Sequence, residues 1–206
     1  NIVLDDLDDL DPAKFKSTAE EFEYFRSQLR TTRAWFYIRL LDAYRNLPLT
    51  IYGDAEKNDR RQVAPKTIFE FIETELKESL GGLPIKESTA GNGSIQGQWT
   101  QGAVASLLVR LYLNAEKWIG EDRYGQCATY AEQIIAGYYG YYQLDEKLDK
   151  PFDWDNEKSN EVIMGFPSKY GRTHWHYDAA DMYWRTVPAR ANPFFKVTKL
   201  TLTNCK

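Results

Sequence analysis

Residues 170–184 combine flat aromatic rings with planar hydrogen-bonding side chains, a mixture that can bind sugars. The segment contains Tyr170, Arg172, Thr173, His174, Trp175, Tyr177, Asp178, Asp181, Tyr183 and Trp184. A pyranose has C–H bonds on its face and hydroxyls at its rim, so rings stack on the face while carboxylate or guanidinium groups hold the rim. Aromatic residues that pack a loop onto helices have the same composition. The spacing alone favours packing over binding.

Two other groups of residues could carry chemistry, but each lacks a necessary part. His174 and His176 could share one face of an extended segment and bind a metal, yet no third ligand is recognisable. Asp153, Asp155 and Glu157 offer oxygen ligands for Ca²⁺, without the twelve-residue loop and central glycine typical of such a site. The sequence has no nucleophile elbow and no evident acid–base pair. We therefore expect no enzyme activity, no metal and no cofactor.

The composition limits the classes of partner. The chain has 206 residues, with 26 Lys and Arg against 30 Asp and Glu, and a net charge of −4. This mild acidity, without a basic block, argues against nucleic acid or an anionic membrane surface as partner. No apolar run approaches the roughly 20 residues of a membrane-spanning helix. Cys127 and Cys205 lack the spacing of a metal site and cannot form a disulfide framework.

A long helix is predicted over residues 17–46. It begins at a capping box, made either by Ser17 with Glu20 or by Thr18 with Glu21, and it ends before Pro48. At 1.5 Å per residue its length is about 45 Å. Its predicted core face consists of Phe22, Phe25, Leu29, Phe36, Leu40 and Ala43.

Three shorter helices are predicted after this one. The first begins at Pro65 and buries Ile68, Ile72, Leu76 and Leu80. The second is capped by Thr100, extends to Gly120 and buries Ala103, Leu107, Leu111, Ala115 and Trp118. The third covers about 123–136 and buries Tyr124, Cys127, Ala131, Ile134 and Ile135. The short connection makes the last two helices antiparallel neighbours, a hairpin similar to a tetratricopeptide unit.

The remaining segments are predicted to be irregular. The acidic stretch at 5–11 indicates a solvated linker or the approach to a helix, and the one short strand is expected over 161–166. The predicted fold class is mainly all-α, with tetratricopeptide-like helical hairpins, long irregular loops and a few short strands. We divide the chain into an N-terminal linker (1–16), a helical scaffold (17–145) and an irregular, incomplete ligand-binding segment (146–206).

Four stretches in this order resemble the SusD/RagB family, which comprises surface-exposed outer-membrane lipoproteins of Bacteroidota nutrient-uptake systems. They are residues 32–41 with 46–49, residues 68–76, residues 99–115 with 131–139, and residues 155–164. The resemblance extends from about Phe22 to Phe166. Arg45 and Asn46 stand where the family usually has Gly-Asp or Gly-Asn. The lipid-carrying cysteine and much of the C-terminal half of the family are absent, so the resemblance implies a fragment.

The resemblance implies a function in polysaccharide utilisation. It implies a helical scaffold that packs on a TonB-dependent outer-membrane transporter and captures oligosaccharides or polysaccharides without catalysis at the cell surface. The membrane would be reached only through a lipid anchor that this chain does not contain. The loop after the predicted strand contributes to the aromatic platform of the family, and that loop is 170–184 here. The expected ligand-binding residues are Trp175 and Tyr177, followed by Tyr170, Arg172, His174, Asp178 and Trp184.

Two other functions remain open from the sequence. The helical hairpins and aromatic residues could bind a peptide or dock a protein, because helical repeats commonly do so. An all-α glycoside hydrolase would need more helical hairpins and a defined carboxylate pair.

Overall fold

Six α-helices account for most of residues 1–87, 97–152 and 156–166, the part of the chain that this computed structural model describes. They are α1 (Ile2–Asp9), α2 (Ala19–Tyr44), α3 (Pro65–Ser79), α4 (Gln101–Leu113), α5 (Ala115–Ile119) and α6 (Tyr124–Ile135). Two short strands, β1 (Leu47–Pro48) and β2 (Gln62–Val63), pair antiparallel, with Leu47 opposite Val63. Single 3₁₀ turns lie at Pro12–Phe15, Ala55–Lys57, Leu80–Gly82, Lys150–Phe152 and Asn156–Lys158. The predicted all-α fold class is confirmed.

The long helix α2 begins at the second of the two predicted capping boxes. The Thr18 hydroxyl accepts a hydrogen bond from the Glu21 amide (3.1 Å), and the Glu21 carboxylate accepts one from the Thr18 amide (2.9 Å). The helix ends at Arg45, whose φ of +64° cannot continue an α-helix. Glycine adopts a positive φ readily, whereas a residue with a Cβ such as Arg45 does so only at a cost.

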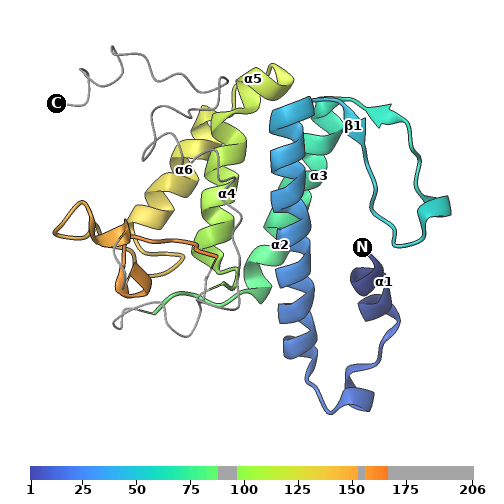
Figure 1. Ribbon diagram of the computed structural model, residues 1–206, viewed down its shortest axis with the longest axis horizontal. Coiled ribbons are helices and arrows are strands. Elements are labelled where there is room, and N and C mark those ends of the chain that lie inside the picture. Colours follow the sequence, from blue (N-terminus) through green and yellow to red (C-terminus); the bar gives the residue numbers. More distant parts are fainter. Residues whose placement is uncertain (88–96, 153–155, 167–206) are drawn as a thin grey trace, which may run out of the picture. The chain divides into compact units, whose positions relative to one another are not determined.

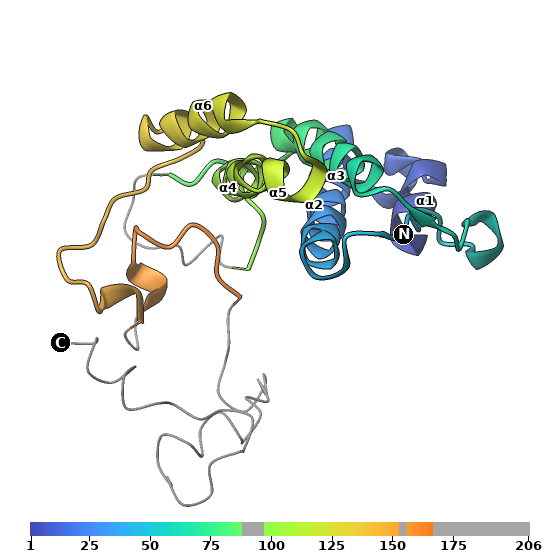
Figure 2. The ribbon, with the colours of Figure 1, turned by 90° about the horizontal axis from the view of Figure 1, so that it is seen from above.

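The helices form two neighbouring pairs (Figure 1). In the first pair α3 packs antiparallel to α2, with the Thr31 hydroxyl 2.9 Å from the Ser79 hydroxyl at one end and the Tyr37 ring 5.2 Å from the Phe71 ring farther along. In the second pair α6 packs back along α4, as Figure 1 shows, and the predicted hairpin is therefore confirmed. Viewed from above, α1 lies on the side of α2 away from α4 and α6 (Figure 2).

The core is formed between α2, α3 and α4. Its fully buried large side chains include Ile38, Leu41, Ile68, Phe69, Ile72, Leu76, Val104, Leu108, Leu111 and Tyr112. The predicted inward residues of α3 and of the helix that begins after Thr100 are buried or partly buried as expected. That second helix is interrupted at Asn114, which ends α4 before the single turn α5.

The predicted core face of α2 is wrong in most positions. Phe25, Phe36 and Leu40 are 53%, 56% and 38% exposed, and only Phe22 is buried as predicted. The buried face instead consists of Ser27, Thr31, Ala34, Tyr37, Ile38 and Leu41. The small residues on this face let α3 approach closely, while large apolar residues occupy the opposite side as well. Periodicity alone could not decide which of two apolar faces is covered.

Three further predictions require correction. In α6, Tyr124 and Ile135 are 45% and 86% exposed, whereas Cys127 and Tyr130 pack against the core. The strand expected over 161–166 is not formed, and no strand lies beside those residues in the described part of the chain. The acidic stretch expected as a linker or helix approach is itself helical over Ile2–Asp9. Contacts with α2 and with residues 50–53 hold α1 in place.

Candidate functional site

The ligand-binding residues that the sequence predicts lie outside the described residues. This holds for Tyr170, Arg172, His174, Trp175, Tyr177, Asp178 and Trp184. Asp153, Asp155 and the side chain of Glu157, the candidate calcium ligands, also lie outside them. All of these remain predictions. The described residues contain two other features that could bind a partner, a groove along α2 and an aromatic cluster that shares Phe36 with it.

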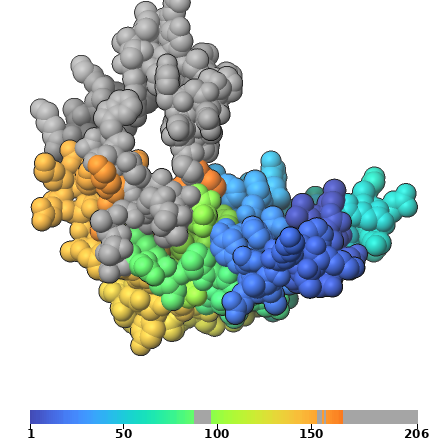
Figure 3. All heavy atoms as spheres, turned by 90° about the horizontal axis from the view of Figure 1, so that it is seen from below, coloured from blue at the N-terminus to red at the C-terminus, as the bar shows by residue number. Residues whose placement is uncertain are grey.

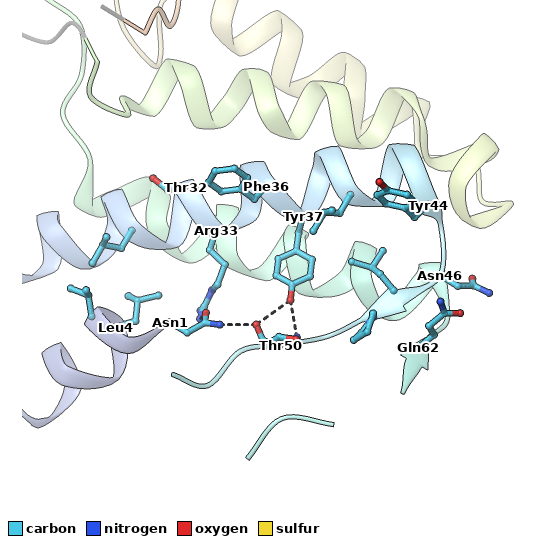
Figure 4. A pocket seen from close by; sticks show the side chains of 15 residues that line it. Asn1, Leu4, Thr32, Arg33, Phe36, Tyr37, Tyr44, Asn46, Thr50 and Gln62 are labelled. Atoms are coloured by element: carbon cyan, nitrogen blue, oxygen red, sulfur yellow. Dashed lines mark hydrogen bonds between the residues drawn. The ribbon is translucent and has the colours of Figure 1, made fainter. Parts of the chain in front are cut away.

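The exposed side of α2 forms one wall of a groove of about 740 Å³, shown in Figure 4. Helix α1 and the chain from Asn46 to Thr50 form the other walls. The apolar lining consists of Val3, Leu4, Leu29, Phe36, Tyr37, Leu40, Tyr44, Leu47 and Pro48, and the polar lining of Asn1, Thr32, Arg33, Asn46, Thr50 and Gln62. Figure 3 shows α1 and the start of α2 on the surface next to the segment from β1 to β2.

Most polar groups at the base of the groove are already paired. The Tyr37 hydroxyl donates to the Thr50 carbonyl (3.0 Å) and accepts from the Thr50 amide (2.7 Å). The Asn1 amide group donates to the same carbonyl (2.9 Å), and Arg33 donates to the Asn1 side-chain oxygen (3.0 Å). Figure 4 shows these side chains meeting at Thr50. The surface left for a partner is therefore mainly apolar, which suits an apolar polypeptide segment better than a charged ligand.

The second feature is a group of four aromatic residues, Trp35, Phe36, Trp99 and Phe166, which we call the aromatic cluster. The Trp35 ring centroid lies 4.8 Å from that of Phe36, 5.4 Å from that of Phe166 and 6.4 Å from that of Trp99. Phe166 and Trp99 form an edge-to-face pair at 6.4 Å. These distances and tilts are typical of favourable aromatic pairs.

Helix α2 holds Trp99 in a fixed position within the aromatic cluster. The Gln28 side chain accepts from the Trp99 amide (2.9 Å) and donates to the Trp99 carbonyl (2.8 Å). The Trp99 indole N–H donates to the Thr32 hydroxyl (2.8 Å). Trp99 is only 6% exposed, whereas Phe36 and Phe166 are 56% and 48% exposed. The cluster thus has a fixed, buried base and two rings that are open to solvent.

The most buried carboxylate network has a structural role. Glu75 is almost fully buried and accepts hydrogen bonds from Arg30 (2.9 Å) and Arg33 (2.8 Å), while Glu78 pairs with Arg30 from the surface. Burial acts to lower the pKa of Arg30, but the attraction and hydrogen bonds of Glu75 and Glu78 together outweigh burial and raise the pKa. With each carboxylate oxygen of Glu75 paired to an arginine, this network joins α2 to α3 and has no free acid or base.

Lys86 forms a second buried polar connection. Its ammonium donates to the Asn160 carbonyl (3.2 Å) and lies 4.9 Å from the centre of the Tyr142 ring. Burial lowers the pKa of Lys86, and Asp145 acts in the opposite direction. Asp145 in turn accepts a hydrogen bond from Ser159. These contacts connect Tyr142 and Asn160 to Lys86, which lies in the chain before α4.

The described residues contain neither a cluster of metal ligands nor a membrane-spanning helix. Among these residues, no three His, Cys, Asp or Glu side chains gather where they could hold a metal ion. Within the same part of the chain, none of the helices has the length and apolar character needed to cross a membrane.

Comparison with known proteins identifies the fold. No family model matches the sequence, and no curated protein matches it. A laminarin-binding SusD-like protein superimposes with a TM-score of 0.63 over 78% of this chain at 23% identity. The chain has the SusD-like fold. Surface glycan-binding protein A from Bacteroides uniformis matches with a TM-score of 0.63 at 20% identity, and a SusD superfamily protein from Bacteroides vulgatus with 0.64 at 19%.

The chain spans about a third of these SusD-like proteins. It covers 33% of the laminarin-binding protein, 34% of the Bacteroides uniformis protein and 32% of the Bacteroides vulgatus protein, whereas 78–79% of this chain is matched.

The sequence contained a signal for the aromatic cluster that our prediction did not use. Trp35 and Phe36 are adjacent on a helix, where successive side chains point about 100° apart. Two neighbouring large rings therefore cannot both face the same narrow core stripe. The pairing of these rings with Trp99 and Phe166 depends on the tertiary fold and has no counterpart in sequence spacing.

Proposed function

We propose that this chain belongs to a non-catalytic glycan-binding protein of the bacterial cell surface. The observation that carries the proposal is the SusD-like fold, shared with one protein named as laminarin-binding and another named as a surface glycan-binding protein. The aromatic residues of the chain supply the rings that sugar binding requires. We further propose that the protein acts at the outer membrane with a TonB-dependent transporter and reaches the membrane only through a lipid anchor.

We assign capture of the glycan to residues 170–184, with Trp175 and Tyr177 as the stacking rings. Arg172, His174 and Asp178 are proposed to hold the hydroxyl rim, and Tyr170 and Trp184 to extend the stacking surface. In calorimetric titrations against a panel of oligosaccharides and polysaccharides, the wild-type chain should bind at least one of them. Trp175→Ala and Tyr177→Ala should each weaken that binding. Wild-type affinity in both variants would remove this platform.

Binding without turnover is the second part of the proposal. Incubation of the chain with each bound glycan should release no reducing ends above those released by a heat-denatured sample. Steady release that increases with protein concentration would contradict the proposal and favour a glycoside hydrolase.

The groove along α2 supports a second candidate function, the docking of a polypeptide. Its exposed lining is mainly apolar, and the polar groups around Thr50 are already paired. Tyr44, which lines the groove, is 70% exposed, so Tyr44→Cys can carry a fluorophore there. An apolar peptide that binds in the groove should displace this fluorophore and change its emission. Leu40→Asp should abolish that binding, whereas Leu113→Asp, a change at an exposed leucine outside the groove, should not.

A further inference from the structure

We infer that the aromatic cluster, together with Arg39, binds a sugar that carries a carboxylate, a uronic acid unit of an acidic glycan. This inference rests on the proposed glycan-binding function and adds a site and a substrate class to it. The exposed rings of the cluster would stack on the sugar, and the guanidinium of Arg39 would pair with its carboxylate.

The rings of the cluster have the exposure that stacking needs. One side of Phe36 packs against Trp35 at 4.8 Å, and Phe166 packs against both Trp35 and Trp99, yet each phenylalanine remains about half exposed. A ring fixed on one side and open on the other can accept the C–H face of a pyranose with little loss of side-chain entropy. Because Phe36 lies on a 26-residue helix, its position is set before the ligand arrives.

Arg39 supplies the charge next to these rings. Its guanidinium lies 5.8 Å from the centre of the Trp35 ring, and the side chain is exposed. Within the described residues Arg39 forms no ion pair, in contrast to Arg26, Arg30, Arg33 and Arg45 of the same helical region. An arginine held over an aromatic face with its hydrogen-bond donors open to solvent is suited to bind a carboxylate in bidentate fashion.

The spacing of Phe36 and Arg39 fits one sugar unit. Residues three apart on a helix have Cβ atoms about 5–6 Å apart and lie on the same face. A uronic acid carries its carboxylate directly on the ring carbon at the edge of the pyranose. A ring stacked on Phe36 can therefore direct its carboxylate toward Arg39. A neutral hexose would use the ring but leave the positive charge without a partner.

The test compares ligands that differ by one chemical group. Galacturonate oligomers and mannuronate oligomers are titrated against the wild-type chain, with the methyl esters of the same oligomers as neutral controls. At least one free acid should bind, and its ester should bind about tenfold more weakly or worse, since the charged hydrogen bonds are lost. Affinity for the acid should also fall with added salt. A glutamate oligomer of equal charge but without sugar rings should bind more weakly than the acidic sugar.

Variants locate the site. Arg39→Gln should weaken binding of the acidic oligomer about tenfold and leave binding of its ester unchanged. Phe36→Ala should weaken both about three- to tenfold, since it removes the stacking ring. Matched controls are Arg60→Gln, an exposed arginine in the loop before α3, and Phe25→Ala, a 53% exposed phenylalanine on the same helix. Both controls should bind like the wild type, and circular dichroism should show that every variant is folded.

The outcomes separate this inference from the proposed function. If neutral glycans bind but no uronate does, the inference is overturned and the proposed function stands. The same holds if a uronate binds and Trp175→Ala abolishes the binding while Arg39→Gln and Phe36→Ala do not change it. Equal binding of the glutamate oligomer would overturn the assignment to a sugar. If the chain binds no glycan of any kind, both the inference and the proposed function fail.

Discussion

Glu75 shows how a single side chain connects two helices. Its side chain is only 4% exposed, and it lies between Arg30 and Arg33 of α2. Glu75→Gln removes the charge that compensates both arginines, so we expect the free energy of unfolding to fall by about 3 kcal/mol. Urea unfolding measures the change. Glu78→Gln, which affects a 54% exposed partner of Arg30, should cost less than about 1 kcal/mol. Equal effects of the two variants would contradict a buried network centred on Glu75.

The surroundings of Glu73 predict how the stability of the fold depends on pH. Burial acts to raise the pKa of Glu73, but hydrogen bonds from Lys77 and Tyr112 outweigh burial, and the pKa lies below the ordinary value of 4.5. A carboxylate with a lowered pKa in the folded state stabilises the protein above its ordinary pKa, and this stabilisation is lost as the pH falls through the folded value.

We therefore expect the stability difference between the wild type and Glu73→Gln to be largest near pH 7 and to shrink below about pH 4.5. Urea midpoints measured at several values between pH 7 and pH 3 test this expectation. Glu70→Gln is the control, because Glu70 is exposed and its carboxylate comes no closer than 4.0 Å to the ammonium of Lys66. A difference for Glu73→Gln that stays constant over this range would contradict the assigned hydrogen bonds.

At the scale of elements, the start of α2 tests the choice between two overlapping capping boxes. Thr18 makes the cap in the structure, whereas Ser17 only precedes it. Thr18→Ala should lower the free energy of unfolding by about 1 kcal/mol, because it removes the hydrogen bond to the Glu21 amide. Ser17→Ala should change it by less than half of that amount. Thermal or urea unfolding measures both, and a larger effect for Ser17→Ala would show that the other box is used.

The connection between α4 and the segment after α6 is equally testable. Gly102 and Gly125 are each the second residue of their helix, but a Cβ at Gly102 would lie 2.1 Å from the Tyr142 hydroxyl, whereas one at Gly125 would meet open space. Gly102→Ala should therefore destabilise the protein by displacing the Tyr142 ring. Gly125→Ala should leave stability unchanged or raise it by up to about 1 kcal/mol. Urea unfolding compares them, and destabilisation by both would contradict the packing of Tyr142.

The sequence predicts the helices well because their signals are local. Pro65 and Thr100 begin helices as expected, and the four-residue steps from Ile68 to Leu76 give a buried face. The buried side of α2 was mistaken because both of its faces are apolar, and the choice depends on where α3 packs. The expected strand at 161–166 failed for a similar reason, since a strand needs a neighbour that local composition does not supply.

The same limit applies to the candidate site. The rings of the aromatic cluster come from residues up to 131 positions apart, from Trp35 to Phe166, and no spacing rule connects them. The groove along α2 likewise depends on α1 and on the position of Thr50. Sequence composition could indicate that aromatic residues are available for binding. It could not indicate which of them remain exposed after the helices pack.

At the scale of the whole molecule, the described local features belong to a SusD-like fold. The chain matches about a third of each related structure, and the proposals about glycan, transporter and location concern the whole protein. The scaffold is held together by an apolar core between α2, α3 and α4 and by the polar connections of Glu75 and Lys86. It can therefore present exposed rings from fixed positions.

Calorimetric titration of the wild-type chain with a panel of neutral and acidic glycans tests the central claim most directly, with an apolar peptide titrated in parallel. The account predicts saturable binding of at least one glycan, with no release of reducing ends over the course of the titration. It also predicts that Trp175→Ala and Tyr177→Ala weaken the binding of that glycan. Saturable binding of the peptide with no heat from any glycan would contradict the claim.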